Sequence, residues 1–460
     1  MSLPAHWNKL RAKCIFREVD ERSTTGREEL LSVSHLTGVT PRSQKTITMF
    51  LAKSNVGHKT CRPDDVVINT MWAWMGALGT TRQTGIVSPA YGVYRPLAGC
   101  DILPRYADQL LRTPEYAAEY QRRSTGVNSS RLRLYPEQFL RIAVIVPPLD
   151  EQAGIVRFLD WAIERLVQAI RAKKKVISLL NEQKQAIIHR AVTRGLDPSV
   201  TRGLDPSVTL KPSSIPWLGD IPQHWEVRRL KSLCRFVTSG SRGWARYYAD
   251  SGSIFLRIGN ISTTSVELRL KRITYVTPPA DAEGERTRVL PDDLLLSITA
   301  QIGAVGIVPE GLGEAFVNQH TALIRLRRGA VLPRWVAYGL LSQFGKDQCQ
   351  LLTNGGTKVG LTLDDVRCLV VLLPPFDEQV RIVNGIEHET HDLNTAISRL
   401  EREIDLLREY RIRLVADVVT GKLDVREAAA QLPEEPTLDT TEEDSDLIID
   451  PEAADEELAI

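Results

Sequence analysis

One long segment of this chain occurs twice, 227 residues apart, and both copies have the pattern of a coiled-coil helix. Each copy opens with a PP-x-DEQ motif, at Pro147 and at Pro374, and closes with V-T-x-x-L-D, at Asp197 and at Asp424. The offset is the same at both ends, so neither copy contains an insertion relative to the other. Such an internal repeat limits the architecture before any single motif is considered, because both copies must fold in the same way.

Apolar residues in both copies recur at the a and d positions of a heptad, which packs one helix against another. The proline pair indicates where each helix begins, and Gly195 and Gly421 indicate where it ends. A rod of about 45 residues extends about 65 Å. The predicted seam consists of Leu159, Leu166, Ile170, Ile177 and Leu180 in the first copy and Leu393, Leu400, Leu407 and Leu414 in the second.

The sequence before each rod also repeats, but more weakly. His6-Trp7 recurs as His224-Trp225, and Pro63-Asp64-Asp65 recurs as Pro291-Asp292-Asp293. Residues 1–147 and 217–373 are therefore expected to be two versions of one α+β domain with different loops, and a turn before a strand is expected at each Pro-Asp-Asp. A constant scaffold under variable loops is typical of recognition modules. Strands are expected at Ser253 to Arg257, Asp293 to Ile298 and Ala322 to Leu326, and Gly85 to Tyr91 aligns with Ala315 to Thr321.

Composition restricts the class of protein. The length of 460 residues allows about three domains, and a hydrophobic content of 43% supports real cores. No apolar run is long enough for a membrane helix, and the six cysteines are dispersed without a C-x-x-C, which suits reduced thiols in the cytoplasm of a bacterium or archaeon. Neither a membrane partner nor a secretion signal is expected.

The formal net charge of +1 hides an uneven distribution. Twelve of the acidic residues follow residue 432, where there is no Lys or Arg, so residues 1–432 carry a charge of about +13. The positive body suits phosphate binding. The acidic tail, 429–460, has the composition of a disordered segment.

The chain contains no convincing catalytic centre. His388-Glu389-Thr390-His391 is one residue short of a zinc-binding H-E-x-x-H, so no metal site is expected. Leu373 and Val146 stand where an amino-methyltransferase motif requires Asn or Asp before the prolines. We therefore expect neither nuclease nor methyltransferase activity from this chain alone.

The duplicated PP-x-DEQ rods, each following a variable domain, resemble the specificity subunits of type I restriction-modification enzymes. The resemblance covers residues 1 to about 428. It implies two target recognition domains, each reading half of a split double-stranded DNA site, separated by two long antiparallel helices. It also implies two modification (methyltransferase) subunits and motor-nuclease subunits as partners, with S-adenosylmethionine, ATP and Mg in those partners and no cofactor in this chain. The implied division is 1–147 and 217–373 for the recognition domains, 148–197 and 374–428 for the helical spacers, 198–216 for a linker and 429–460 for the tail.

Polar and aromatic residues in the loops of the two domains are candidates for contact with bases and phosphates. In the first domain, Trp72 and Trp74 are expected on one face of a strand, where at least one packs in the core. The half-site sequences do not follow from these residues. The candidates are Arg42, Lys45, Thr70, Trp72, Arg82 and Gln83 in the first domain, and Ser239, Ser241, Arg242, Trp244, Tyr247, Arg257, Asn260, Gln301, Asn318, Gln319, His320 and Lys358 in the second.

Two alternatives stay open at this point. The rods are expected to pair within one chain, but a stand-alone DNA-binding or scaffold protein would use them as arms that dimerise with other chains. The octapeptide TRGLDPSV beginning at Thr193 is also repeated at once from Thr201. In the resembled family, repeats at this junction set the distance between the two readers, whereas chance duplication is the other explanation.

Overall fold

The structure is a computed structural model, and it describes residues 3–44, 54–126, 132–195, 209–215, 217–240, 242–278, 282–327, 329, 331–353 and 360–432. Lys45, Ser241 and Lys358 lie outside the described residues, as do the tandem octapeptide beyond Gly195 and the acidic tail after 432. None of the helices in the described part of the chain is long and apolar enough to span a membrane.

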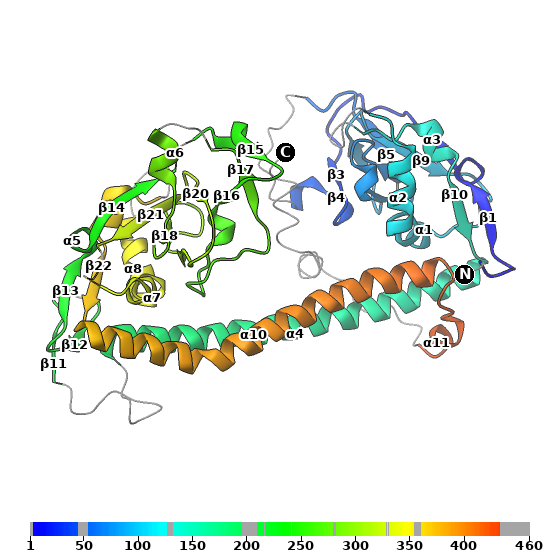
Figure 1. Cartoon of the computed structure of the whole chain (residues 1–460). Coiled ribbons are helices and arrows are strands. Elements are labelled where there is room, and N and C mark those ends of the chain that lie inside the picture. The colour runs from blue at the N-terminus through cyan, green and yellow to red at the C-terminus, as the bar shows by residue number, and fades with distance from the viewer. Residues whose placement is uncertain are drawn as a thin grey trace. The chain divides into compact units, whose positions relative to one another are not determined.

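The chain forms two compact units. Unit 1 consists of residues 1–175 and 400–460, and unit 2 consists of residues 176–399. Two long helices, α4 (Leu149–Arg194) and α10 (Phe376–Val419), each contribute one half to each unit (Figure 1). The six-segment division expected from the resemblance stays a prediction.

The long helices begin and end where the duplicated motifs predict. Each starts directly after its proline pair, which is compatible with the first turn of a helix but not with its interior. Gly195 and Gly421 follow the two helices with φ values of 86° and 74°. These left-handed conformations strain any residue with a Cβ, so glycine ends both helices.

The two long helices pair with each other in an antiparallel arrangement (Figure 1). In unit 1, Lys173 Nζ lies 2.5 Å from Glu403 Oε2. In unit 2, Lys184 Nζ donates to Asn394 Oδ1 at 2.7 Å. Residue numbers therefore rise along α4 as those of the facing α10 residues fall. The prediction that the rods pair within one chain is confirmed, which disfavours free arms.

Burial is uneven along the predicted seam. Leu159 and Ile170 are fully buried and Leu414 is 7% exposed. The other six predicted seam residues are partly buried: Leu166, Ile177, Leu180, Leu393, Leu400 and Leu407.

Unit 1 contains a four-stranded sheet in the order β2-β9-β6-β7 and three small two-stranded pairings. The first strand, β1, pairs antiparallel with β10, the strand that leads into α4. The elements are β1 (Asn8–Arg11), β2 (Phe16–Glu18), β3 (Leu31–Ser34), β4 (Gly38–Pro41), β5 (Lys59–Cys61), β6 (Val66–Ile68), β7 (Leu78–Thr80), β8 (Gly85–Val87), β9 (Gly92–Pro96), α1 (Pro104–Leu111), α2 (Pro114–Arg123), α3 (Pro136–Leu140), β10 (Ala143–Val146) and α11 (Arg426–Ala430).

Unit 2 repeats this topology. Its sheet β14-β21-β18-β19 has the same order of equivalent strands, and β13 pairs with β22 as β1 pairs with β10. A second sheet, β15-β17-β16-β20, is larger than its counterpart β5-β8 in unit 1. The elements are β11 (Leu210–Pro212), β12 (Asp220–Pro222), β13 (Glu226–Arg229), α5 (Leu230–Leu233), β14 (Cys234–Ser239), β15 (Tyr248–Ala249), β16 (Ser253–Leu256), β17 (Thr274–Val276), α6 (Ala282–Thr287), β18 (Leu294–Ser297), β19 (Val305–Ile307), β20 (Ala315–Val317), β21 (Thr321–Leu326), α7 (Pro333–Leu341), α8 (Gln343–Leu352), α9 (Leu363–Cys368) and β22 (Val370–Leu373).

The α+β class and the pseudo-repeat are therefore confirmed, and the three predicted strands correspond to β16, β18 and β21. Each unit has its own main core, in which long-helix residues pack against the domain. In unit 1, Leu159 and Val418 join the cluster that contains Trp7. In unit 2, Ile188 and Ile386 join the cluster that contains Trp225 and Trp335.

The cysteines make a testable contrast. Burial raises the pKa of Cys61, Cys234 and Cys349 to about 12, whereas Cys14 and Cys368 are exposed. Because the thiolate is the reactive form, we expect iodoacetamide at pH 8 to label the two exposed thiols of the native protein and to spare these three. Peptide mass spectrometry before and after unfolding measures this, and rapid native labelling of Cys61 would contradict the packing of unit 1.

Candidate nucleic-acid interface

The duplicated His-Trp and Glu-Gln motifs meet at the start of α4. Trp7 Nε1 donates to Glu151 Oε2 at 2.9 Å, and His6 Nε2 lies 2.7 Å from Glu151 Oε1. The side chain of Gln152 is fully buried, and its Oε1 accepts the Leu103 backbone N–H at 2.7 Å. These contacts attach the domain to the first turn of α4.

The same junction occurs at the start of α10 in unit 2. Trp225 Nε1 donates to Glu378 Oε1 at 3.0 Å, and His224 Nε2 lies 2.8 Å from Glu378 Oε2. Gln379 Oε1 accepts the Leu332 backbone N–H at 2.9 Å. Acidic residues in the first turn of a helix, here Asp377 and Glu378, compensate the helix dipole. Glu378 has a further role, because its carboxylate orients the Trp225 indole and the His224 imidazole.

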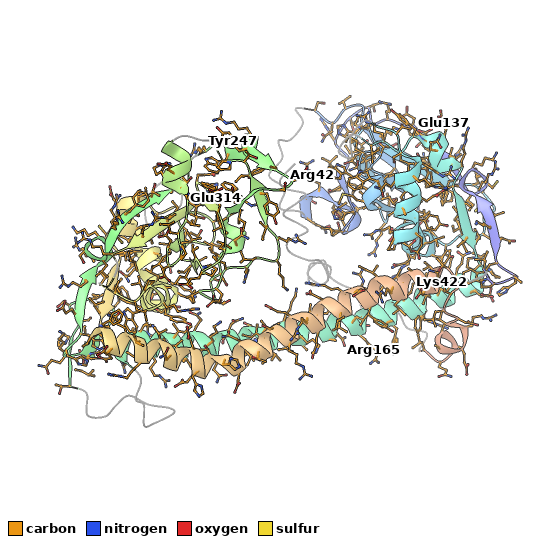
Figure 2. The ribbon with its side chains drawn as sticks, in the orientation of Figure 1. Arg42, Glu137, Arg165, Tyr247, Glu314 and Lys422 are labelled. Carbon is orange, nitrogen blue, oxygen red and sulfur yellow. The ribbon has the colours of Figure 1, made fainter. Side chains whose placement is uncertain are left out.

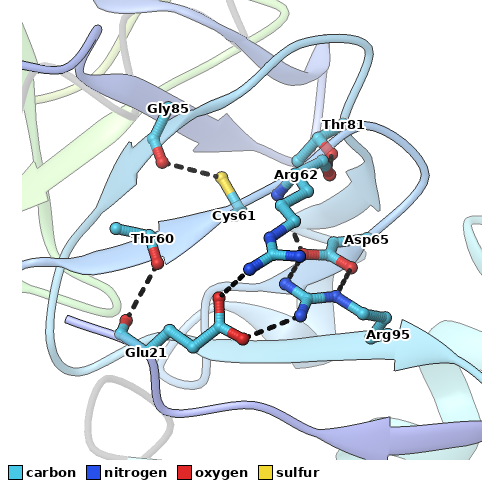
Figure 3. A network of polar contacts seen from close by, with 8 residues as sticks. All are labelled: Glu21, Thr60, Cys61, Arg62, Asp65, Thr81, Gly85 and Arg95. Carbon is cyan, nitrogen blue, oxygen red and sulfur yellow. Dashed lines mark hydrogen bonds and ion pairs between the residues drawn. The ribbon is translucent and has the colours of Figure 1, made fainter. Parts of the chain in front are cut away.

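The Pro-Asp-Asp repeat forms a buried ion pair in each unit. In unit 1, Arg95 Nε and Nη2 each donate at 2.9 Å to the two oxygens of Asp65, which is 1% exposed (Figure 3). Arg95 Nη1 also donates to Glu21 at 2.9 Å, and Asp65 accepts the Arg62 backbone N–H. This two-point ion pair between Arg95 and Asp65, called the fork below, joins three segments of the sheet. Its hydrogen bonds raise the pKa of the Arg95 guanidinium.

Unit 2 repeats the fork, and the Arg288 carbonyl, 3.1 Å from Arg325 Nη2, stands in place of the second carboxylate. Arg325 Nε and Nη2 donate to Asp293 at 2.8 and 2.6 Å, and Asp293 accepts the Leu290 backbone N–H at 2.7 Å. The preceding residues, Asp64 and Asp292, have φ values of 73° and 69°. The expected turn before a strand is confirmed at both sites, and both buried carboxylates have structural partners.

Three predicted DNA-binding residues of the second domain are buried, and their contact with DNA stays a prediction. Trp244 is 3% exposed and stacks on Phe255 with ring centroids 5.2 Å apart. Asn260 closes a 3-10 turn, accepting the Arg257 N–H and donating to two backbone carbonyls. Asn318 Oδ1 accepts two hydrogen bonds from its own turn. The Trp244 ring packs against side chains of two distant strands, whereas the two amides hydrogen-bond to their own or a neighbouring turn.

Other predicted residues of the second domain face solvent. Arg242, Arg257 and Gln301 are exposed. Ser239 is partly buried, as is Tyr247, which Figure 2 labels. The guanidinium of Arg246, which the sequence reasoning missed, lies 4.7 Å from the centre of the Tyr247 ring. These exposed guanidinium groups near β15 and β16 are suited to phosphate contact.

In the first domain, Trp72 and Trp74 do not lie on a strand. Trp72 directly precedes a 3-10 turn, Ala73–Met75, and Trp74 lies within it. Their partly buried rings stack with centroids 6.0 Å apart. The prediction of a shared strand face is wrong, because turn hydrogen bonds hold this segment. Thr70 Oγ1 donates to the Ala90 carbonyl at 2.9 Å, and Arg42 is partly buried. Of the remaining candidates, the structure leaves two exposed: Arg82 and Gln83.

Comparisons with known proteins agree with this geometry. The family model of the type I restriction modification DNA specificity domain matches residues 222–404. The chain is similar to the putative type I restriction enzyme MjaX specificity subunit of Methanocaldococcus jannaschii, with 23% identity over 68% of this chain and 65% of that protein. It is also similar to the type I restriction enzyme EcoBI specificity subunit of Escherichia coli, with 24% identity over 53% of this chain and 50% of that protein. The chain thus spans less than two thirds of the length of both curated relatives.

A solved structure shares the fold. It is a chain from a structural study of complex assembly and conformational transition of the type I R-M system, with a TM-score of 0.53 and 14% identity. The alignment covers 92% of this chain and all of that chain. Residues 222–404 thus match the type I restriction modification DNA specificity domain, and the chain is similar to specificity subunits of type I restriction enzymes.

Proposed function

We propose that this chain is the non-catalytic DNA-specificity subunit of a type I restriction-modification complex and binds a bipartite, asymmetric DNA site. The observation that carries the proposal is the repeat of one sheet topology and one His-Trp to Glu-Gln junction in two units with different loops. Two recognition domains that share one fold but differ in their loops are suited to binding two different half-sites. The spacing between half-sites follows from the separation of the readers.

The proposal includes partners for chemistry that the chain does not perform. Two modification subunits with S-adenosylmethionine would methylate adenine, and motor-nuclease subunits with ATP and Mg would cleave DNA. Among the described residues, no group of three or more His, Cys, Asp or Glu side chains is arranged to hold a metal ion. The specificity chain would bind DNA and position these partners.

The test is sequencing of methylated adenine in cells that express the chain together with the modification subunit of the same restriction-modification system. The expected result is methylation at one bipartite motif, lost when this chain is omitted. Methyl transfer by the isolated chain would contradict a non-catalytic role. Scattered methylation without a motif would contradict the role in specificity.

An Arg242→Ala variant separates DNA binding from assembly. Arg242 is exposed on a turn of unit 2, so its replacement should leave folding and co-purification with the methyltransferase unchanged. Loss of one phosphate or base contact is expected to weaken binding about 5- to 100-fold. Electrophoretic mobility shifts of the complex measure this, with Arg228→Ala as the control, because Arg228 is exposed on β13 and pairs with Glu226. Equal weakening by both variants would indicate a loss of general charge only.

A further inference from the structure

The turn that joins β20 to β21 is held rigidly in unit 2. The buried Asn318 Oδ1 accepts the His320 backbone N–H at 3.2 Å and the Thr321 hydroxyl at 2.9 Å. The Gly240 N–H donates to the Asn318 carbonyl at 3.1 Å, and a Cβ at Gly240 would lie 2.2 Å from the Val317 oxygen. The close approach of these two backbones explains the glycine and leaves the turn little freedom.

The imidazole of His320 is held from both sides. Its Nδ1 lies 2.9 Å from Thr299 Oγ1, in the loop between β18 and β19, and its Nε2 lies 2.8 Å from Gln319 Nε2. An amide nitrogen can only donate, so His320 Nε2 must be the acceptor. The ring proton therefore sits on Nδ1 and is donated to Thr299. In this tautomer the ring holds the Gln319 amide with its nitrogen toward His320.

Two hydrogen-bonding groups of the oriented Gln319 amide are available to a ligand. Within the described part of the chain, no hydrogen bond uses Gln319 Oε1 or the second N–H of Gln319 Nε2. An acceptor beside a donor matches the N6 amino group and N7 of adenine in the major groove. Guanine presents two acceptors at the corresponding edge, so it offers no donor to the amide oxygen.

We propose that Gln319, oriented by His320 and Thr299, reads one adenine in the half-site bound by the second recognition domain. This assignment rests on the proposed function and names the base chemistry of that site. His320 and Thr299 are positioning residues, because they act through the amide of Gln319. Gln301, exposed two residues beyond Thr299 with a φ of 49°, is the competing reader.

The first domain supplies an internal comparison. There, Thr70 Oγ1 donates to the carbonyl of Ala90, in the turn that aligns with the turn of His320. The Thr70 hydroxyl binds the backbone of that turn, whereas in unit 2 the Thr299 hydroxyl contacts the side-chain ring of His320. Pro89 occupies the position of Gln319 and has no side-chain donor or acceptor. The reading group is therefore a property of the second domain, as different half-sites require.

The experiment compares the methylated motif of wild type with that of Gln319→Ala, each co-expressed with the methyltransferase. The variant should accept other bases at one A·T position of one half-site, with discrimination there reduced about 10- to 100-fold. The other half-site should not change, and a Pro89→Ala control should alter neither. Relaxation at a G·C position, an unchanged motif, or relaxation by Gln301→Ala instead would overturn the assignment. Absence of any motif with the wild-type chain would refute the proposed function itself.

Variants of His320 test the positioning role. His320→Leu removes the acceptor and should relax the same A·T position, because the amide can then rotate. His320→Gln carries an oxygen able to accept the Gln319 N–H, so it should restore most of the discrimination. A histidine with only a structural role would lower the thermal stability of both variants without changing the motif, and that result would contradict the proposed orientation.

Discussion

An Asp293→Ala variant is expected to lose about 3 kcal/mol of folding stability in unit 2, because it leaves the Arg325 guanidinium without its carboxylate. Asp293 is 2% exposed and accepts both the guanidinium and the Leu290 backbone N–H. For a unit of this size the loss corresponds to a fall of about 6–12 °C in Tm. Differential scanning calorimetry of the purified chain measures the shift.

The matching variant in unit 1 should cost less. Asp65→Ala also removes a buried carboxylate, but Glu21 stays 2.9 Å from Arg95 Nη1 and retains part of the charge pairing. Asp292→Gly is the control, because Asp292 is exposed and has a left-handed φ of 69° that glycine adopts without strain. A greater loss from Asp65→Ala than from Asp293→Ala would contradict this account of the two forks.

The long helices could be predicted from the sequence because their signals are local. A proline pair begins each helix, glycine ends it, and the heptad between them determines which face packs. The order of the strands could not be predicted, because the strands of the four-stranded sheets are two to six residues long and their partners are distant in sequence. Their alternation is too short to specify register. The repeat predicted two like domains, and the structure provided their topology.

In the candidate site, too, local sequence signals were informative but contacts with distant residues could not be predicted. Trp244 lies in a polar, glycine-rich loop that favoured an exposed aromatic, but Phe255 and Phe316 from two later strands enclose its ring. The hydrogen bonds that hold the His320 ring include one to Thr299, and nothing local in the sequence indicates the role of that threonine.

A Leu159→Asp variant is expected to have the largest effect on the helical seam, at least about 4 kcal/mol. Leu159 is fully buried in the cluster that contains Trp7 and Val418, so the new carboxylate has neither water nor a cation there. A loss of this size approaches the whole stability of an average domain. Hydrogen exchange should show reduced protection throughout the sheets of unit 1, and Leu159→Asn should do less damage because it adds no charge.

The control is Leu406→Asp on α10, where the leucine is 63% exposed and the change should stay within about 0.5 kcal/mol. Leu400→Asp and Leu407→Asp should fall between these limits, because both residues are only partly buried.

Ile386, 227 residues after Leu159 and fully buried in unit 2, provides the reciprocal test. If Leu159→Asp weakened only unit 1 and Ile386→Asp only unit 2, each half of the helix pair would belong energetically to its own domain. Loss of protection in both units from either variant would instead mean that the paired helices make the chain a single cooperative unit, and equal effects from Leu159 and Leu406 would contradict the seam itself.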